Sequence, residues 1–191
     1  MITEAAKGLF NEHGYANVSI EDIADVLGVR KGALYYHVAR KASLLTQIVS
    51  DLLQPIARRV DEIAGSSRPP LDKLRVAASE HVEHILANQA AARIFFEQAR
   101  DLPPDERVDL DQLGAVITRA FGRIIAEGID SGAFRAADPD LLTLQVLALC
   151  NWPYRWFRRS GPSSMGRVRA ATVESVLLLV TSSTDASEEE T

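Results

Sequence analysis

The sequence contains a single cysteine, Cys150, and lacks the long apolar segments that mark membrane and secreted proteins. One cysteine cannot form a disulfide within the chain, which favours a reducing cytoplasm. No apolar run reaches the roughly 18 residues that a membrane-spanning helix needs. The N-terminus also lacks the basic and then apolar layout of a secretory signal. We therefore expect no membrane association and no disulfide framework.

The sequence also lacks the marks of a catalytic or cofactor-binding site. It has no glycine-rich phosphate loop and no nucleophile elbow, and Cys150 lies in an apolar segment. His81 and His84 are three residues apart beside two glutamates, and this spacing could hold a metal ion on a helix. Two histidines on a polar helix face more commonly belong to a solvated surface. We expect no catalytic residue, no metal and no cofactor.

Strand periodicity is absent as well. No segment alternates apolar and polar residues convincingly, whereas apolar residues recur at helical spacing through most of the chain. Clusters of glycine, proline and serine separate these stretches, most clearly GSSRPP at 65–70. The sequence predicts an all-α fold, with helices at about 3–13, 20–27, 30–37, 41–63, 71–87, 89–100, 106–131, 139–158 and 164–181.

Negative charge is missing from one short segment, although the chain as a whole has a formal net charge of -5. Residues 28–41, GVRKGALYYHVARK, contain four cations, two adjacent tyrosines and no carboxylate. Upstream of this segment carboxylates dominate. Such segregation allows one face to meet a polyanion while the opposite side repels it. Without further context, a short cationic helix is more commonly a solvated surface.

The residues around this segment predict a helix-turn-helix motif. Ser19 would begin the first short helix as an N-cap, with Asp22 placed to complete a capping box. Gly28 allows the positive φ angle of the tight turn between the two helices. Gly32 and Ala33 are small enough to let the second helix approach the bases in a major groove. The motif predicts binding to double-stranded DNA.

Residues 5–45 resemble the N-terminal domain of the TetR (tetracycline-repressor-type) transcriptional regulators. The resemblance rests on the Gly-Tyr pair after the first helix, on Ser-Ile-x-x-Ile-Ala and on Gly-x-x-x-Gly-x-Leu-Tyr-x-His-x-x-x-Lys. It implies a DNA-binding domain at 1–46 and a larger helical domain at 47–191 for ligand binding and dimerisation. It also implies that the following residues contact DNA: Ser19, Arg30, Lys31, Gly32, Ala33, Tyr35, Tyr36, His37 and Lys41.

Individual roles within this set follow from the same resemblance. Arg30 to Ala33 would face bases, with Tyr36 as a further candidate, while Tyr35, His37 and Lys41 would hold phosphates. Arg30 stands where the family usually has a capping serine or threonine. We therefore expect it to give up an N-cap in exchange for a cation that seeks a base or a phosphate.

The two helices expected at 139–158 and 164–181 are apolar on almost every side. Such helices need cover on more than one face, which a two-fold partner or a monomer core could supply. In TetR-like proteins the last two long helices form the dimer through a four-helix bundle. The resemblance therefore implies a homodimer that binds an inverted repeat.

The segment CNWPYRWFRRSGP at 150–162 combines aromatic rings with cations. Trp152 and Trp156 are four residues apart and would share a helix face, and Arg155 and Arg159 would share the neighbouring one. Rings beside guanidinium groups suit a ligand with a flat ring and phosphates. The segment resembles Asn-Trp-x-x-x-Trp-(Tyr/Phe)-Arg-x-x-Gly of TetR proteins linked to fatty-acid and sterol degradation, whose effectors are acyl-coenzyme A thioesters. Alternatively, the tryptophans pack at the dimer interface and the arginines are solvated.

These features together predict a homodimeric transcriptional regulator, a repressor released from its operator by a small-molecule effector such as an acyl-CoA. The alternative from another class is an enzyme that acts on a small acyl compound and has kept a helix-turn-helix scaffold. The lack of a catalytic constellation favours the regulator.

Overall fold

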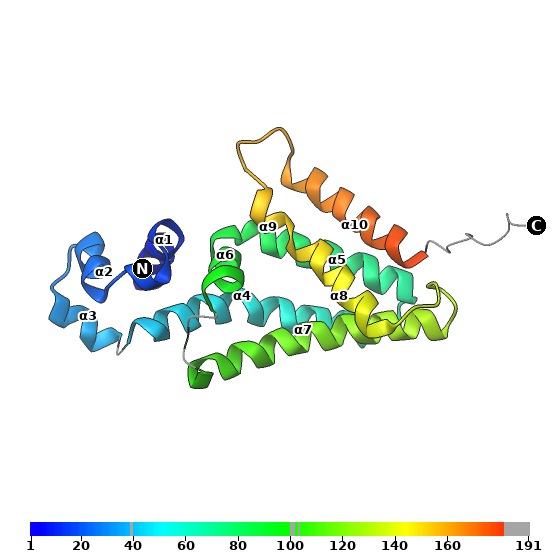
Figure 1. The fold of residues 1–191 in the computed structure, drawn as a ribbon, viewed down its shortest axis with the longest axis horizontal. Coiled ribbons are helices and arrows are strands. Elements are labelled where there is room, and N and C mark those ends of the chain that lie inside the picture. Colours follow the sequence, from blue (N-terminus) through cyan, green and yellow to red (C-terminus); the bar gives the residue numbers. More distant parts are fainter. Residues whose placement is uncertain (39, 100–101, 103, 182–191) are drawn as a thin grey trace, which may run out of the picture. The chain divides into compact units, whose positions relative to one another are not determined.

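The computed structural model describes residues 1–38, 40–99, 102 and 104–181, which fold into helices with no strand among them (Figure 1). The all-α prediction is confirmed. The elements are α1 (Ile2–His13), η1 (Tyr15–Asn17), α2 (Ile20–Leu27), α3 (Lys31–His37), α4 (Lys41–Ala64), α5 (Pro70–Ala87), α6 (Gln89–Gln98), α7 (Pro104–Asp130), α8 (Pro139–Asn151), α9 (Pro153–Trp156) and α10 (Met165–Thr181).

Local sequence signals set the ends of α2. The Ser19 hydroxyl accepts the N–H of Asp22 at 3.1 Å, and the Asp22 carboxylate accepts the N–H of Ser19 at 2.7 Å. This is the capping box that the sequence predicts, and it satisfies two backbone donors that the helix leaves without partners. Gly28 ends α2 in the left-handed conformation, with φ 66° and ψ 28°.

The helix expected at 139–158 is divided in two. α8 ends at Asn151 and α9 begins at Pro153, after which the chain leaves helical geometry at Phe157. Proline has no N–H to donate, and its ring clashes with the preceding turn, so the sequence contains the signal for this break. The division turns the second half of the aromatic segment away from the axis that a continuous helix would follow.

The chain folds into two compact units. One comprises Met1–Ala57 and Ala87–Ala115, and the other comprises Arg58–Leu86 and Val116–Thr191. The first unit therefore contains α6 together with the N-terminal helices, and α1 packs against α6. A boundary at 46/47 stays a prediction, because α4 runs through that point without a break.

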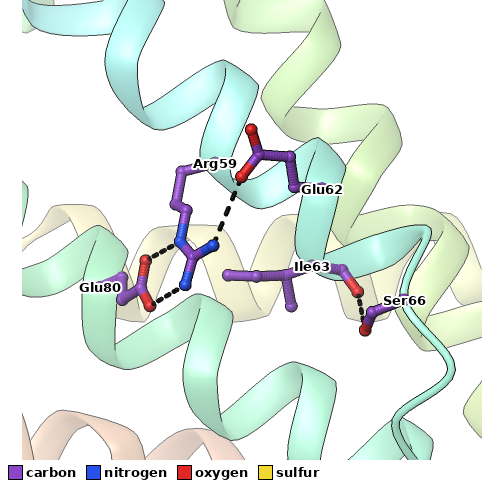
Figure 2. Close-up of polar contacts among 5 residues, drawn as sticks. All are labelled: Arg59, Glu62, Ile63, Ser66 and Glu80. Atoms are coloured by element: carbon purple, nitrogen blue, oxygen red, sulfur yellow. Dashed lines mark hydrogen bonds and ion pairs between the residues drawn. The ribbon is translucent and has the colours of Figure 1, made fainter.

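Polar contacts fix the C-terminal part of α4 inside the second unit. Arg59 donates from Nε to one oxygen of Glu80 at 2.6 Å and from Nη2 to the other at 2.9 Å, and it also reaches Glu62 (Figure 2). This contact holds the pKa of the Glu80 carboxyl below its usual range.

The buried Lys73 donates to the Ala64 carbonyl at 3.1 Å and to Glu127 at 2.7 Å. A cation at these last carbonyls of α4 also complements the helix dipole.

Candidate nucleic-acid interface and ligand groove

A tight turn joins α2 to α3. The N–H of Val29 donates to the Ala24 carbonyl and that of Gly28 to the Asp25 carbonyl, both at 3.1 Å. Ile23, Ala24 and Leu34 are almost completely buried, so the two helices pack through small and apolar side chains. This is the predicted helix-turn-helix geometry, and it leaves the opposite face of α3 in solvent.

The exposed face of α3 carries most of the residues predicted to contact DNA. Arg30, Lys31, Gly32 and Ala33 are all exposed, as are Tyr35 and, to 88%, Tyr36. Arg30 occupies the N-cap position without a side-chain capping bond, as its departure from serine or threonine predicts. The structure thus brings these six residues together, whereas the side chain of His37 lies outside the described part of the chain.

Lys31 is paired within the motif. Its ammonium contacts the carboxylate of Glu21 on α2 and lies 5.7 Å from the centre of the Tyr35 ring. The Glu21 hydrogen bond raises the pKa of Lys31, and Lys31 lowers that of Glu21. Both side chains are well exposed, and exposed ion pairs are weak, so Lys31 can exchange Glu21 for a phosphate at little cost.

The Ser19 side chain is hydrogen-bonded within the cap of α2. Its only hydroxyl hydrogen points to the Asp22 carboxylate at 2.7 Å, so donation to a DNA phosphate would require the hydroxyl to turn away from Asp22. The Ser19 backbone N–H and hydroxyl also hold the pKa of Asp22 below its usual range. In this geometry Ser19 fixes the start of α2.

Lys41, at the start of α4, points toward the chain between α1 and α2. Its ammonium donates to the carbonyls of Tyr15 at 2.7 Å and Val18 at 2.8 Å, and it lies 4.2 Å from the centre of the Tyr15 ring. Burial lowers the pKa of Lys41. An ammonium has three donors, so internal acceptors already engage two of them.

In the second unit, α8, α9 and α10 enclose a groove of about 730 Å³. Trp152 and Trp156 both line it, with exposures of 59% and 49%. Arg155 and Arg159 are exposed but do not line the groove, whereas Arg167 of α10 does. The structure thus brings the two tryptophans to one groove and leaves the two predicted arginines outside its lining.

Arg167 was not predicted from the sequence. It lies in the first turn of α10, eleven residues beyond Trp156 across a glycine- and proline-containing turn. Only the packing of α10 against α8 brings it to the tryptophans. The sequence signal was present in the form of another arginine close to the aromatic segment, but nothing local determined which arginine faces the groove.

His81 does not lie on a solvated face, and that expectation is wrong. It is 3% exposed, its Nε2 lies 2.7 Å from Oδ1 of Asn151, and its ring meets Phe121 edge-on. Burial lowers the pKa of His81 to about 4, so the ring is neutral at pH 7. In the part of the chain that the structure describes, no three potential metal ligands of the His, Cys, Asp or Glu type gather at one place.

Two protein-family models match the chain. Residues 2–48 match "Bacterial regulatory proteins, tetR family", and residues 67–180 match "Tetracyclin repressor-like, C-terminal domain". The chain belongs to the TetR family. The resemblance inferred from the helix-turn-helix residues is therefore confirmed, and the protein is a TetR-family transcriptional regulator.

Individual transcriptional regulators resemble this chain over most of its length. The transcriptional repressor KstR2 of Mycobacterium tuberculosis is 27% identical over 175 residues, which cover 87% of this chain and 84% of KstR2. Its structure, described as a ketosteroid transcriptional regulator, superposes with a TM-score of 0.86 over 95% of this chain and 94% of that one. PfmR of Thermus thermophilus is 28% identical, with a TM-score of 0.84 over 94% and 96% of the two chains.

A third solved structure shares the fold at lower identity. AibR, in complex with isovaleryl coenzyme A and operator DNA, is 21% identical, with a TM-score of 0.81 over 92% of this chain and 96% of that one. Across the described ranges of the present chain, no helix is both long and apolar enough to cross a bilayer.

Proposed function

We propose that this TetR-family regulator is a cytoplasmic homodimeric repressor, not an enzyme, that binds an inverted repeat through α3. The observation that carries the proposal is the exposed outer face of α3, where Arg30 and Lys31 stand beside two tyrosines. Two-fold symmetry would present this face twice, so the operator should contain two half-sites related by the same symmetry.

Each side chain on this face has a distinct role in the proposal. The Arg30 guanidinium can donate two hydrogen bonds to a guanine edge, because the residue is exposed and its side chain makes no capping bond to α3. Gly32 and Ala33 let the backbone approach the groove, and a β-carbon added at Gly32 would meet no atom within 4 Å. Tyr35 supplies a phosphate contact, and Lys31 and Tyr36, which the resemblance places at bases, are proposed to reach phosphates as well; such contacts fix the position of the helix on the duplex.

Selection from a library of random duplexes tests this proposal. We expect the wild-type protein to enrich an inverted repeat, and Arg30→Ala to relax the preference at one base pair of each half-site by about 1–3 kcal/mol. Arg58→Ala, which removes an exposed arginine from the second unit, should leave the enriched sequence unchanged. A wild-type protein that enriches no sequence would contradict DNA recognition by α3.

The dimer is proposed from the outer face of the α8–α10 pair. Large apolar side chains there are strongly exposed, and such clusters mark interaction surfaces. The exposed members outside the groove described above are Leu141, Leu144 and Leu178. A second copy of the same face would cover them.

The effector is proposed to be an acyl-CoA thioester bound at the α8–α10 groove. The groove volume of about 730 Å³ is appropriate for a ligand of this kind. Trp152 and Trp156 can stack on the adenine, while Arg167 can pair with phosphates. Arg155 and Arg159, which are exposed and close to the tryptophans in sequence, are proposed as further phosphate partners. The isovaleryl-CoA held by AibR and the description of KstR2 as a ketosteroid regulator support this class of ligand.

Titration with a panel of acyl thioesters tests the effector. We expect long-chain or sterol-derived thioesters to change tryptophan fluorescence and to displace the operator, because release requires a ligand that prefers the state with low DNA affinity. Free coenzyme A should act weakly. Arg167→Ala combined with Arg155→Ala and Arg159→Ala should abolish the response and preserve DNA binding.

The matched control for this titration is Arg119→Ala, which removes an exposed arginine of α7. It should respond as the wild type does. Chromatography of the thioester after incubation should show it unchanged, because the proposal assigns no turnover. Hydrolysis or transfer of the acyl group would favour the enzyme alternative, and no displacement by any thioester would reject this effector class.

A further inference from the structure

The corner between α1 and α2, residues 14–18, is held by side chains that lie far away in the sequence. Lys41 of α4 donates to two of its carbonyls, and Gln98 of α6 contacts its backbone from another helix. α2 begins immediately after this corner, and α3 follows α2 through the tight turn at Gly28. The orientation of the corner therefore bears directly on the orientation of the recognition helix.

The groups around the Lys41 side chain suit an ammonium group. The Tyr15 and Val18 carbonyls accept hydrogen bonds at 2.7 and 2.8 Å, and the Tyr15 ring lies 4.2 Å away, within range of a cation–π contact. The residue is partly buried. Hydrogen bonds from a charged donor are among the stronger ones in proteins, so these contacts strongly favour the observed position of the Lys41 ammonium.

To contact a phosphate, the Lys41 ammonium would have to lose these contacts, at least in part. Moving the ammonium to an outside phosphate would take a charged donor away from the carbonyls of Tyr15 and Val18, and the Tyr15 carbonyl would keep only weaker contacts such as the N–H of Val18 at 3.4 Å. An outside phosphate costs Arg30 and Lys31 less, because both side chains are exposed and the contact of Lys31 with Glu21 is an exposed ion pair. The cations of segment 28–41 thus fall into two groups with different surroundings.

Gln98 supports the same corner by a contact without net charge. Its Oε1 accepts the N–H of Tyr15 at 2.9 Å, and its Nε2 donates to the Phe10 carbonyl at 3.0 Å. α1 and α6, which carry these groups, pack against each other. The peptide groups of Tyr15 are therefore bound on both sides, by Gln98 at the N–H and by Lys41 at the carbonyl.

We propose that Lys41 is a positioning residue for DNA recognition, which fixes the α1–α2 corner through the Tyr15 and Val18 carbonyls, and that it is not a phosphate ligand. The proposal rests on DNA binding by α3 as set out above. Gln98 is the second support of the same corner. Loss of either support should disturb the orientation of α2 and α3 without removing a cation from the DNA interface.

The salt dependence of DNA binding separates the two roles of Lys41. Each phosphate contact contributes about 0.9 to the slope of log K against log salt concentration. On a mixed-sequence duplex we expect Lys41→Met to keep the wild-type slope, whereas Lys31→Met calibrates the loss of an exposed cation. If Lys41→Met lowers the slope as much as one phosphate contact would, the proposal is overturned.

Gln98→Leu provides an uncharged counterpart to Lys41→Met. Both variants should weaken binding to the selected operator by about tenfold, roughly the equivalent of one charge-assisted hydrogen bond, and weaken non-specific binding much less. Gln47→Leu, which changes an exposed glutamine of α4, is the control and should bind as the wild type does. Lys41→Arg should not restore operator affinity, because a planar guanidinium does not fit between the Tyr15 and Val18 carbonyls as the ammonium does.

Amide hydrogen exchange at residues 14–18 tests the corner without DNA. We expect faster exchange in Lys41→Met and in Gln98→Leu, in protein that circular dichroism shows to be folded. Unchanged exchange in both variants would overturn the proposal. If the wild type selects no operator, the proposed function fails, whereas the non-specific salt slope and the exchange rates still decide the role of Lys41.

Discussion

Leu178→Glu is expected to abolish the dimer and operator binding together. Leu178 is 58% exposed on α10, among the apolar side chains proposed to meet a second copy of the chain. A glutamate there would bury an unpaired charge, at a cost of about 3 kcal/mol or more, and two-fold symmetry would place two of them in each dimer. We expect the dissociation constant of the dimer to rise at least about a hundredfold.

Sedimentation measured alongside operator binding decides this prediction. Val108→Glu is the matched control, because it places the same charge at an exposed apolar residue of α7, in the first unit. It should remain dimeric. A wild-type protein that sediments as a monomer and still binds the operator tightly would contradict the proposed interface.

Gly128→Ala is expected to destabilise the second unit by about 3 kcal/mol, although alanine is the better helix former by about 1 kcal/mol. Gly128 lies in α7 beneath the buried ring of Phe134, and any β-carbon at this position would overlap that ring. The N–H of Phe134 also donates to the Gly128 carbonyl at 2.9 Å. The ring therefore has to move, and a displaced core phenylalanine loses much of its packing.

The displacement of Phe134 would spread to the end of α10. The next residue, Arg135, donates from its backbone to the Val180 carbonyl at 2.8 Å and from Nε to the Leu179 carbonyl at 2.9 Å. Denaturant unfolding measures the effect, with Gly114→Ala as the control in the same helix. A β-carbon at Gly114 meets no atom within 4 Å, so that variant should be neutral or slightly stabilised. Equal stabilities of the two variants would reject the steric argument.

Residues that cap or break helices made most of the helix boundaries predictable. Ser19 with Asp22, Gly28 and Pro153 each act on the backbone within a few residues, so their effects can be inferred without knowing the rest of the fold. Pro153 marks the division between α8 and α9, although the apolar pattern continues through it. A period of apolar residues indicates which side of a helix is buried, but a proline can redirect the chain within that pattern.

The candidate sites were predictable to unequal degrees. The exposed face of α3 followed from one short segment, because a single helix carries all of its residues. The groove in the second unit did not, because α8, α9 and α10 contribute to it jointly. Arg167 reaches the tryptophans only through the packing of α10, whereas Arg155 and Arg159 do not line the groove although they lie close to the tryptophans in sequence.

The sequence alone determined the helical class, the helix-turn-helix and the family, because caps, turns and the pattern of a single helix are local properties. Tertiary structure alone decided the surroundings of Lys41, Gln98 and His81. Gln98 lies 83 residues from its partner Tyr15, and His81 lies 70 residues from Asn151. Lys41 belongs to the same cationic segment as Arg30, yet it faces two carbonyls, whereas Arg30 faces solvent. The direction of a side chain depends on which helices pack beside it, and the composition of its own segment does not contain that information.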